Sequence, residues 1–517
     1  MKRSLAFLLC IVMLFAFAAC GDQESSETTD KSDATGNIQA GTGESDTSAP
    51  EEEFVLFSNL PEITFDDQTV KFLVEGDYMT SYASVEVMPN VNSSSTLQKA
   101  VKDRNDLVEE QFRVKIDEFR TSSSGEMLST LRENATAGIN EYDIVMPYIP
   151  NAATLSQEGF LTDLRKLENI HLDMPYYDQG SVKDLSICGK NYFVTGDLTL
   201  LAADVTHVLL FNKDVVTNHR LESPYNLVAS GDWTIDKLHE MAKSVTAPTD
   251  ELPEWTHMDT YGFLVNSNFI SSMFIGAGER FTSKDSQDKP IISVYSESAV
   301  STFEKIYTLV NDTTATGQID NSSKGFGSSA VADGKTVWVA ATEAIASGRC
   351  LFRAVSLNAI LALGEYDCNF GVLPAPKLNK LQDRYYCRVS TIYASCIAIP
   401  TNVKDAEMSS VIADAMMQAS TDTSKEAYIE VIMKNRKIQD DESAEILDLI
   451  FESRVYDFGT VFNWGGASEG DVKSITGFMN NIAFHSGTNT FVSTWETIAS
   501  GVQTALDETV DKYLALE

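Results

Sequence analysis

Strand-like and helix-like segments alternate over residues 70–159 of this chain. Short apolar runs at Val70–Val74, Val114–Ile116 and Tyr142–Met146 have the length and composition of buried strands. Between them, apolar residues recur with helical spacing after Ser94 and again over residues 127–135. This order of strand, helix, strand, helix and strand predicts a parallel sheet with helices on both faces. The chain is therefore expected to be an α/β protein.

The same alternation resumes in the second half of the chain. Thr234 precedes a helical pattern, residues 261–265 have the composition of a strand, and residues 298–310 again repeat with helical spacing. A single hydrophobic core stops growing near about 250–300 residues, and the chain has 517 residues. We therefore expect two α/β lobes.

The N-terminus has the pattern of an export signal. Lys2 and Arg3 precede an apolar run from Leu5 to Ala19, which is short for a membrane span and suits a signal peptide. Cys20 follows two alanines, which predicts a lipoprotein cleavage site with residues 1–19 removed and Cys20 lipidated; an ordinary secretory signal is the alternative. Residues 20–53 are rich in Ser, Thr, Gly and acidic residues, so we expect a disordered tether, or alternatively an acidic interaction tail.

The stretch Asp184–Asp214 has three parts that suggest a passage between lobes. Small residues around Gly189 followed by two aromatic residues suggest a tight hairpin. A polar part contains Asp197, and Val205–Phe211 is a β-branched and apolar run typical of a buried strand. Ser390–Ile399 is a second apolar run, which we expect to be the return passage and to pair with the first.

Several short motifs occur in an order that resembles one protein family. Ser186–Phe193 reads SICGKNYF, Gly196-Asp197 follows, and Phe211–Asp214 reads FNKD. Further on, Gly231–Thr234 has the form GxWT and Phe370–Lys377 the form FGxLPxPK. Together these motifs resemble the extracellular solute-binding proteins (family 1) of ABC importers. The run at 440–450, DDESAEILDLI, resembles a clostridial-type branch of that family.

The resemblance implies a two-lobed periplasmic-binding-protein-like fold of type II. Each lobe would be a mostly parallel sheet flanked by helices, and hinge crossings would join the lobes. The expected parts are the first lobe at 54–207, the second lobe at 208–391, a return to the first lobe at 392–445, and a C-terminal helical part at 446–517 that packs mainly on the second lobe.

The resemblance also implies a function in uptake rather than catalysis. The chain would be a lipid-anchored protein on the extracytoplasmic face of the cell membrane, expected as a monomer without metal or cofactor. It would capture a sugar or oligosaccharide between its lobes and deliver it to the permease subunits of an ABC importer. Two alternatives stay open, namely a sensor of the same fold that presents its ligand to a receptor, and a surface glycoside or ester hydrolase.

Composition and motifs limit the other classes of function. The formal net charge of −36 argues against nucleic acid as a partner. The six histidines are scattered without metal-ligand spacing. Gly466–Gly470 has the form GxSxG, but no apolar strand leads into it, so a flexible loop is favoured over a nucleophile at Ser468. The five cysteines after Cys20 are expected to be mainly small buried residues, although Cys350–Cys368 or Cys387–Cys396 pairs stay open.

Binding of a sugar requires flat aromatic faces and planar hydrogen-bonding side chains. In α/β sheets ligands lie beyond the carboxyl ends of the strands. Residues of these types near predicted strand ends or crossings are Glu75, Tyr78, Tyr148, Asp197, Arg353, Tyr393 and Trp464. Each has a structural alternative: Asp197 can cap a turn, Arg353 can form an internal ion pair, and Tyr393 can belong to the core, whereas Trp464 is expected in a loop.

Overall fold

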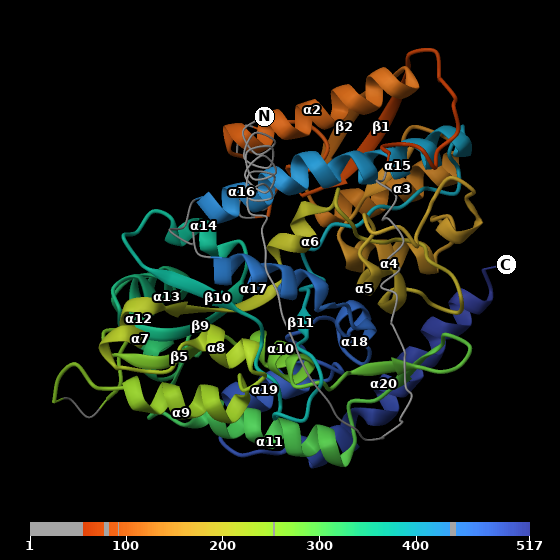
Figure 1. Cartoon of the computed structure of the whole chain (residues 1–517). Helices are drawn as coiled ribbons and strands as arrows, with labels where there is room; N and C mark the ends of the chain where they lie inside the picture. The colour runs from red at the N-terminus through yellow and green to blue at the C-terminus, as the bar shows by residue number, and fades with distance from the viewer. Residues whose placement is uncertain (1–54, 77–81, 91–92, 252–253, 435–440, 517) are drawn as a thin grey trace, which may run out of the picture. The chain divides into compact units, whose positions relative to one another are not determined.

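The computed structural model describes residues 55–76, 82–90, 93–251, 254–434 and 441–516 (Figure 1). The predicted lipidation site Cys20, the tether at 20–53 and the candidate Tyr78 lie outside the described residues.

The first sheet has three parallel strands, as the alternation predicted. They are β1 (Gln68–Glu75), β2 (Val114–Thr121) and β3 (Ile144–Met146), in the order β2-β1-β3. The crossover helices are α2 (Ser95–Phe112) and α3 (Ser124–Ala137), whose first turns are capped by the hydroxyls of Ser94 and Ser123. Gly138 ends α3 in the left-handed conformation (φ 67°), which suits a residue without a Cβ.

The second sheet has five strands in the order β10-β4-β9-β5-β8. Their bounds are β4 (His207–Asn212), β5 (Tyr261–Val265), β8 (Thr316–Gln318), β9 (Cys350–Ser356) and β10 (Phe370–Leu373). Four strands run in one direction and β4 runs in the other, because β4 pairs antiparallel with both β9 and β10 while β5 pairs parallel with β8 and β9. The second sheet is therefore also mostly parallel.

The remaining elements are helices, helical turns and short strands. Those before residue 365 are α4 (Ile149–Gln157), η1 (Leu164–Lys166), α5 (Gln179–Asp184), α6 (Leu200–Asp204), α7 (Lys213–Asn218), α8 (Pro224–Ala229), α9 (Ile235–Val245), α10 (Phe269–Gly276), β6 (Thr282–Lys284), β7 (Pro290–Ile292), α11 (Glu297–Asn311), α12 (Gly325–Ala332), α13 (Val337–Ala346) and α14 (Ala359–Leu363). Those after it are β11 (Cys387–Arg388), α15 (Ala406–Ser420), the π-helical turn η2 (Thr421–Lys425), α16 (Glu426–Lys434), α17 (Asp441–Glu452), β12 (Arg454–Val455), α18 (Phe458–Phe462), α19 (Gly477–His485) and α20 (Phe491–Leu514).

The two predicted crossing segments lie side by side, but they pair over fewer residues than expected. Thr206 bridges Val389, and the amide of Ser390 donates to the carbonyl of Val205 (3.0 Å). The outgoing strand begins only at His207 and pairs within the second sheet. Residues 395–398 of the return segment instead form isolated bridges with Tyr148, Val145 and Val194 of the first part of the chain.

Helix α4 begins at Ile149 directly after Tyr148, and the side-chain amide of Asn151 in its first turn donates to the Glu75 carboxylate. The C-terminal helix α20 packs against α11 and α19 and also against α4, which follows the first sheet. Its Tyr513 hydroxyl lies 2.6 Å from the hydroxyl of Ser156 in α4.

The cysteines after Cys20 are unpaired in the described structure, and all but Cys188 are buried. This agrees with the expectation that most of them act as small apolar residues.

A buried carboxylate fixes α15 to the first sheet's core. Figure 1 shows α15 beside α2, and its buried residues join the same core as β1. The Asp414 carboxylate is fully buried and accepts hydrogen bonds from the hydroxyls of Tyr176 and Tyr177 (both 2.8 Å) and from the amide of His171 (3.0 Å). A helix from the return part of the chain is thus tied to a loop that follows the first sheet.

Replacing Asp414 is expected to destabilise the protein strongly. Asp414→Ala leaves two buried phenols and a backbone amide without their acceptor, so the free energy of unfolding should fall by about 3–5 kcal/mol. Asp422→Ala, at an exposed position on η2, is the control and should change it by less than about 0.5 kcal/mol. Chemical denaturation measures both, and equal effects of the two substitutions would contradict this role for Asp414.

Candidate functional site

Both sheets place the carboxyl ends of their strands next to the crossing segments. In the second sheet, His207 at the amino end of β4 pairs with Ser356 at the carboxyl end of β9. The carboxyl ends of β5, β8, β9 and β10, which all run opposite to β4, therefore lie at the edge where β4 begins. In the first sheet, Tyr148 follows β3 and bridges Ser395 of the return segment. Ligands of open α/β sheets bind at such edges, so the candidate site lies at these strand ends.

Glu75 organises the edge of the first sheet. It is the last residue of β1 and is 1% exposed. Its carboxylate accepts the backbone amide of Tyr148 (2.9 Å) and the side-chain amide of Asn151 (2.8 Å). A buried carboxylate requires such donors, and these fix the start of α4 and the direction of the Tyr148 side chain.

Three tyrosines from distant parts of the chain meet at this edge. We call Tyr82, Tyr148 and Tyr393 the tyrosine cluster. The rings of Tyr82 and Tyr393 are stacked, with centroids 4.4 Å apart and planes inclined by 12°, and Tyr148 meets Tyr393 edge to face at 6.0 Å. The Tyr148 hydroxyl donates to the carbonyl of Tyr82 (3.1 Å). Tyr82 and Tyr393 keep partly exposed surface, so aromatic area remains for a ligand.

Gly76 allows the close approach of Tyr148. Its φ is 117°, and a Cβ at this position would lie 2.3 Å from the Tyr148 hydroxyl. Any other residue at position 76 would displace the tyrosine or the end of β1.

Glu86 connects α6, which directly precedes the outgoing crossing segment, to the return segment. Its fully buried carboxylate accepts the amide of Leu201 in α6 (2.9 Å) and the hydroxyls of Ser395 (2.5 Å) and Ser84 (3.0 Å). Burial disfavours the charged form and raises the pKa of Glu86 to about 7, although the three donors act in the opposite direction.

The edge of the second sheet carries a second polar group of residues. The ring of His207 stacks on Phe269 at 5.4 Å, and its Nδ1 is hydrogen-bonded to the hydroxyl of Ser272. Burial, with the nearby Arg388, lowers the pKa of His207 well below its ordinary value. Arg388 in turn forms a buried ion pair with Glu469. The imidazole is therefore neutral at physiological pH and offers hydrogen bonds rather than charge.

The structure brings together three of the residues predicted from sequence, Glu75, Tyr148 and Tyr393. The other described candidates lie apart from them and have internal partners. Asp197 is 8% exposed and contacts Lys425 and the Thr421 hydroxyl, both at 2.8 Å. Arg353 is buried in β9, donates to the Thr342 hydroxyl (2.8 Å), and has its pKa lowered to about 10 by burial. A ligand contact by either residue stays a prediction.

Trp464 does not occupy the exposed loop position that the sequence suggested. Its ring is 3% exposed, stacks on Phe462 at 5.2 Å, and donates to the Thr509 hydroxyl of α20 (2.8 Å). Trp464 is buried because α18 and α20 close over it. Its contribution to binding likewise stays a prediction.

The GxSxG sequence does not form a nucleophile elbow. Ser468 lies in an irregular loop between α18 and α19, whereas an elbow requires a strand before the serine and a helix directly after it. Among the described residues, no group of three or more His, Cys, Asp or Glu side chains is placed to hold a metal ion.

Sequence reasoning missed several residues of this region, namely Tyr82, Glu86, His207, Arg388 and Glu469. Tyr82 lies close in sequence to the predicted Tyr78 and the same strand-end argument could have included it. The others have no local signature, because their partners lie on distant segments of the chain.

This two-lobed α/β arrangement defines the class of solute-binding proteins, and the comparisons agree. A family model described as bacterial extracellular solute-binding protein matches residues 100–433. The chain belongs to this family, whose members bind solutes and are not enzymes. The clostridial-type branch suggested by the sequence stays a prediction. No curated protein sequence matches the chain.

Solved structures show the same fold at low sequence identity. UgpB from Mycobacterium tuberculosis, in complex with glycerophosphocholine, has a TM-score of 0.53 and 14% identity over 86% of this chain and 99% of its own. A cyclo/maltodextrin-binding protein complexed with maltotetraose has a TM-score of 0.50 and 14% identity over 86% and 96%. MalE from Listeria monocytogenes, in complex with maltose, has a TM-score of 0.50 and 14% identity over 88% and 100%.

Within the described residues, no helix is both long enough and apolar enough to cross a bilayer.

The buried Glu86 predicts a pH dependence of stability. An unfolded glutamate ionises near pH 4.5, whereas Glu86 in the folded protein ionises near pH 7. Between these values the folded state holds the extra proton, so this residue's contribution to stability falls as the pH rises, by about 3 kcal/mol in total. Glu86→Gln removes the titration. The difference in unfolding free energy, variant minus wild type, should therefore increase from pH 4.5 to pH 7.

Denaturation at several pH values measures this difference. Glu110→Gln, at an exposed position on α2, is the control, and its difference from wild type should stay flat. A flat profile for Glu86→Gln as well would show that Glu86 titrates at an ordinary pH.

Proposed function

We propose that this protein captures a neutral sugar or oligosaccharide between its two lobes and delivers it to the permease of an ABC importer. The observation that carries the proposal is the tyrosine cluster at the strand edge beside the crossing segments. Tyrosine faces pack on the apolar faces of sugar rings, and their hydroxyls bond to sugar hydroxyls.

Charge and relatives support a neutral polar ligand. The chain's net charge of −36 disfavours anionic solutes at a distance. Two of the similar structures are described in complex with maltotetraose and with maltose. The identities are low, so these ligands suggest a class of compound for this chain and not a particular sugar.

The proposed mechanism is closure of the lobes about the crossing segments. We assign residues 54–207 and 392–445 to the first lobe and 208–391 to the second, with 446–517 packed mainly on the second. Two short segments that lie side by side can bend while the core of each lobe stays packed, so a ligand that touches both strand edges would favour the closed form. The permease would then recognise that form.

We also propose that the protein is anchored on the extracytoplasmic face of the membrane. The family is extracellular, and the apolar run before Cys20 supports export and lipidation. Residues 20–53 would then hold the folded part away from the bilayer.

Ligand binding is tested by thermal unfolding with a panel of mono- and oligosaccharides that includes maltose and maltotetraose. A ligand that binds only the folded state stabilises it by about 2.7 kcal/mol at 100 times its Kd. Tyr393→Ala should weaken binding roughly tenfold or more, because a stacking face is lost. Tyr366→Ala, at a tyrosine that is 39% exposed elsewhere, should leave binding unchanged. No stabilisation by any sugar of the panel would contradict the proposed ligand class.

Lipidation is tested by labelling cells that express the protein with a fatty acid analogue. Cys20→Ser should abolish the label and release the protein from the membrane fraction, because the acyl chains attach there. Cys188→Ser is the matched control, since this cysteine is partly exposed, and it should keep the label. A soluble, unlabelled wild-type protein would exclude the anchor.

A further inference from the structure

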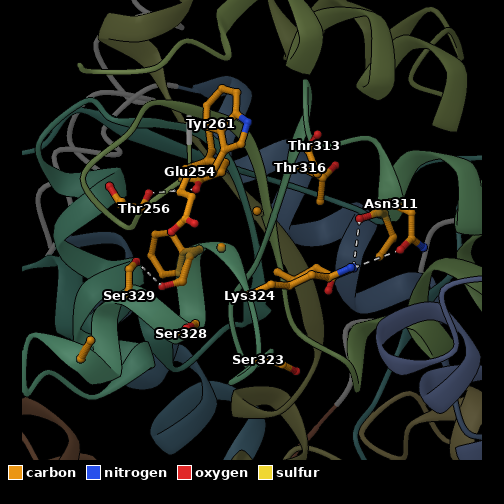
Figure 2. Close-up of a pocket in the computed structure, with 17 residues that line it drawn as sticks. Glu254, Thr256, Tyr261, Asn311, Thr313, Thr316, Ser323, Lys324, Ser328 and Ser329 are labelled. Atoms are coloured by element: carbon orange, nitrogen blue, oxygen red, sulfur yellow. Dashed lines mark hydrogen bonds between the residues drawn. The ribbon is translucent and has the colours of Figure 1, made fainter. Parts of the chain in front are cut away.

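A cavity of about 620 Å³ lies against β8, the edge strand of the second sheet. Its walls come from the end of α11, from β8, from α12, from the start of β5 and from residues 254–256. Figure 2 shows the labelled side chains around this space. None of the lining residues belongs to the tyrosine cluster or contacts Glu86. The volume lies within the range of about 300–1,000 Å³ that is usual for small-molecule sites.

One wall of the cavity is aromatic. Trp255 and Tyr261 have ring centroids 5.6 Å apart, and Tyr261 meets Phe326 edge to face, also at 5.6 Å. The Tyr261 hydroxyl donates to the carbonyl of Thr256 (2.9 Å), which fixes the ring. Tyr261 and Phe326 are almost fully buried, whereas Trp255 keeps partly exposed surface. The indole of Trp255 is therefore the face that a ligand would contact.

The other walls carry neutral polar groups. The hydroxyl-bearing residues Thr313 and Ser328 line the cavity. The side-chain amide of Asn311 donates to the carbonyls of Tyr307 and Ala483 (both 3.0 Å), and its oxygen accepts a long hydrogen bond from the Gln318 side chain (3.5 Å). The charged lining residues are one acid, Glu254, and one base, Lys324, and both are exposed.

We propose that this cavity is a second binding site, for a neutral mono- or disaccharide. An exposed indole face next to hydroxyl and amide groups suits a ring with one apolar face and a rim of hydroxyls. The balanced charges at the lining give no preference for an anion or a cation. The cavity shares no lining residue with the tyrosine cluster or with the two crossing segments, so this site goes beyond the proposed uptake function and does not depend on it.

The test uses the protein labelled with 5-fluorotryptophan, titrated with glucose, galactose and maltose. The chain has five tryptophans, and Trp255→Phe identifies the fluorine resonance of Trp255. At least one of the sugars should shift that resonance saturably. Ser328→Phe, which fills the cavity from α12, should abolish the shift, whereas Ser493→Phe, at an exposed position on α20, should not. The other four resonances report whether each variant is folded.

Tyr393→Ala separates this site from the proposed uptake site. The shift of the Trp255 resonance should persist in this variant, even when stabilisation by sugars at the tyrosine cluster is lost. A Trp255 resonance that none of the three sugars moves, or that moves without saturation, would overturn the second site. The same holds if a folded Ser328→Phe variant keeps the shift.

Discussion

The contact between the two crossing segments determines where the binding edges of this protein lie. Thr206 pairs with Val389, and further along the return segment Ser395 pairs with Tyr148. The carboxyl ends of the strands in both sheets lie next to these segments, so the pairing of the segments determines where the two binding edges lie. Glu86 reinforces the contact, because one buried carboxylate binds both the amide of Leu201 before the outgoing strand and the hydroxyl of Ser395.

Buried carboxylates recur where distant parts of the chain must meet. Asp414 binds α15 to the loop with Tyr176 and Tyr177, and Glu75 binds the start of α4 to the end of β1. Burying a charge is unfavourable unless donors surround it. Such groups therefore stabilise one arrangement of the segments over others that would bury the same apolar surface.

Local patterns predicted the local structure well. Helices follow Ser94 and Thr234 as the apolar spacing predicted, and the three parallel strands of the first sheet alternate with helices along the chain as expected. Glu75 and Tyr148, selected because they follow predicted strands, do lie together at one edge. Trp464 was expected in a loop, but its side chain is buried because α20, the last helix of the chain, covers it.

The sequence by itself determined the α/β class, the order of strands and helices and, through motifs such as SICGKNYF and FNKD, the family. These depend on periodicity and turn chemistry, which act over a few residues. The tertiary structure alone decided that Tyr82 stacks on Tyr393, that Asp197 is paired with Lys425, and that a cavity lies beside β8. These contacts join segments that are far apart in the chain, and a pattern that extends over a few residues cannot specify which distant segments meet.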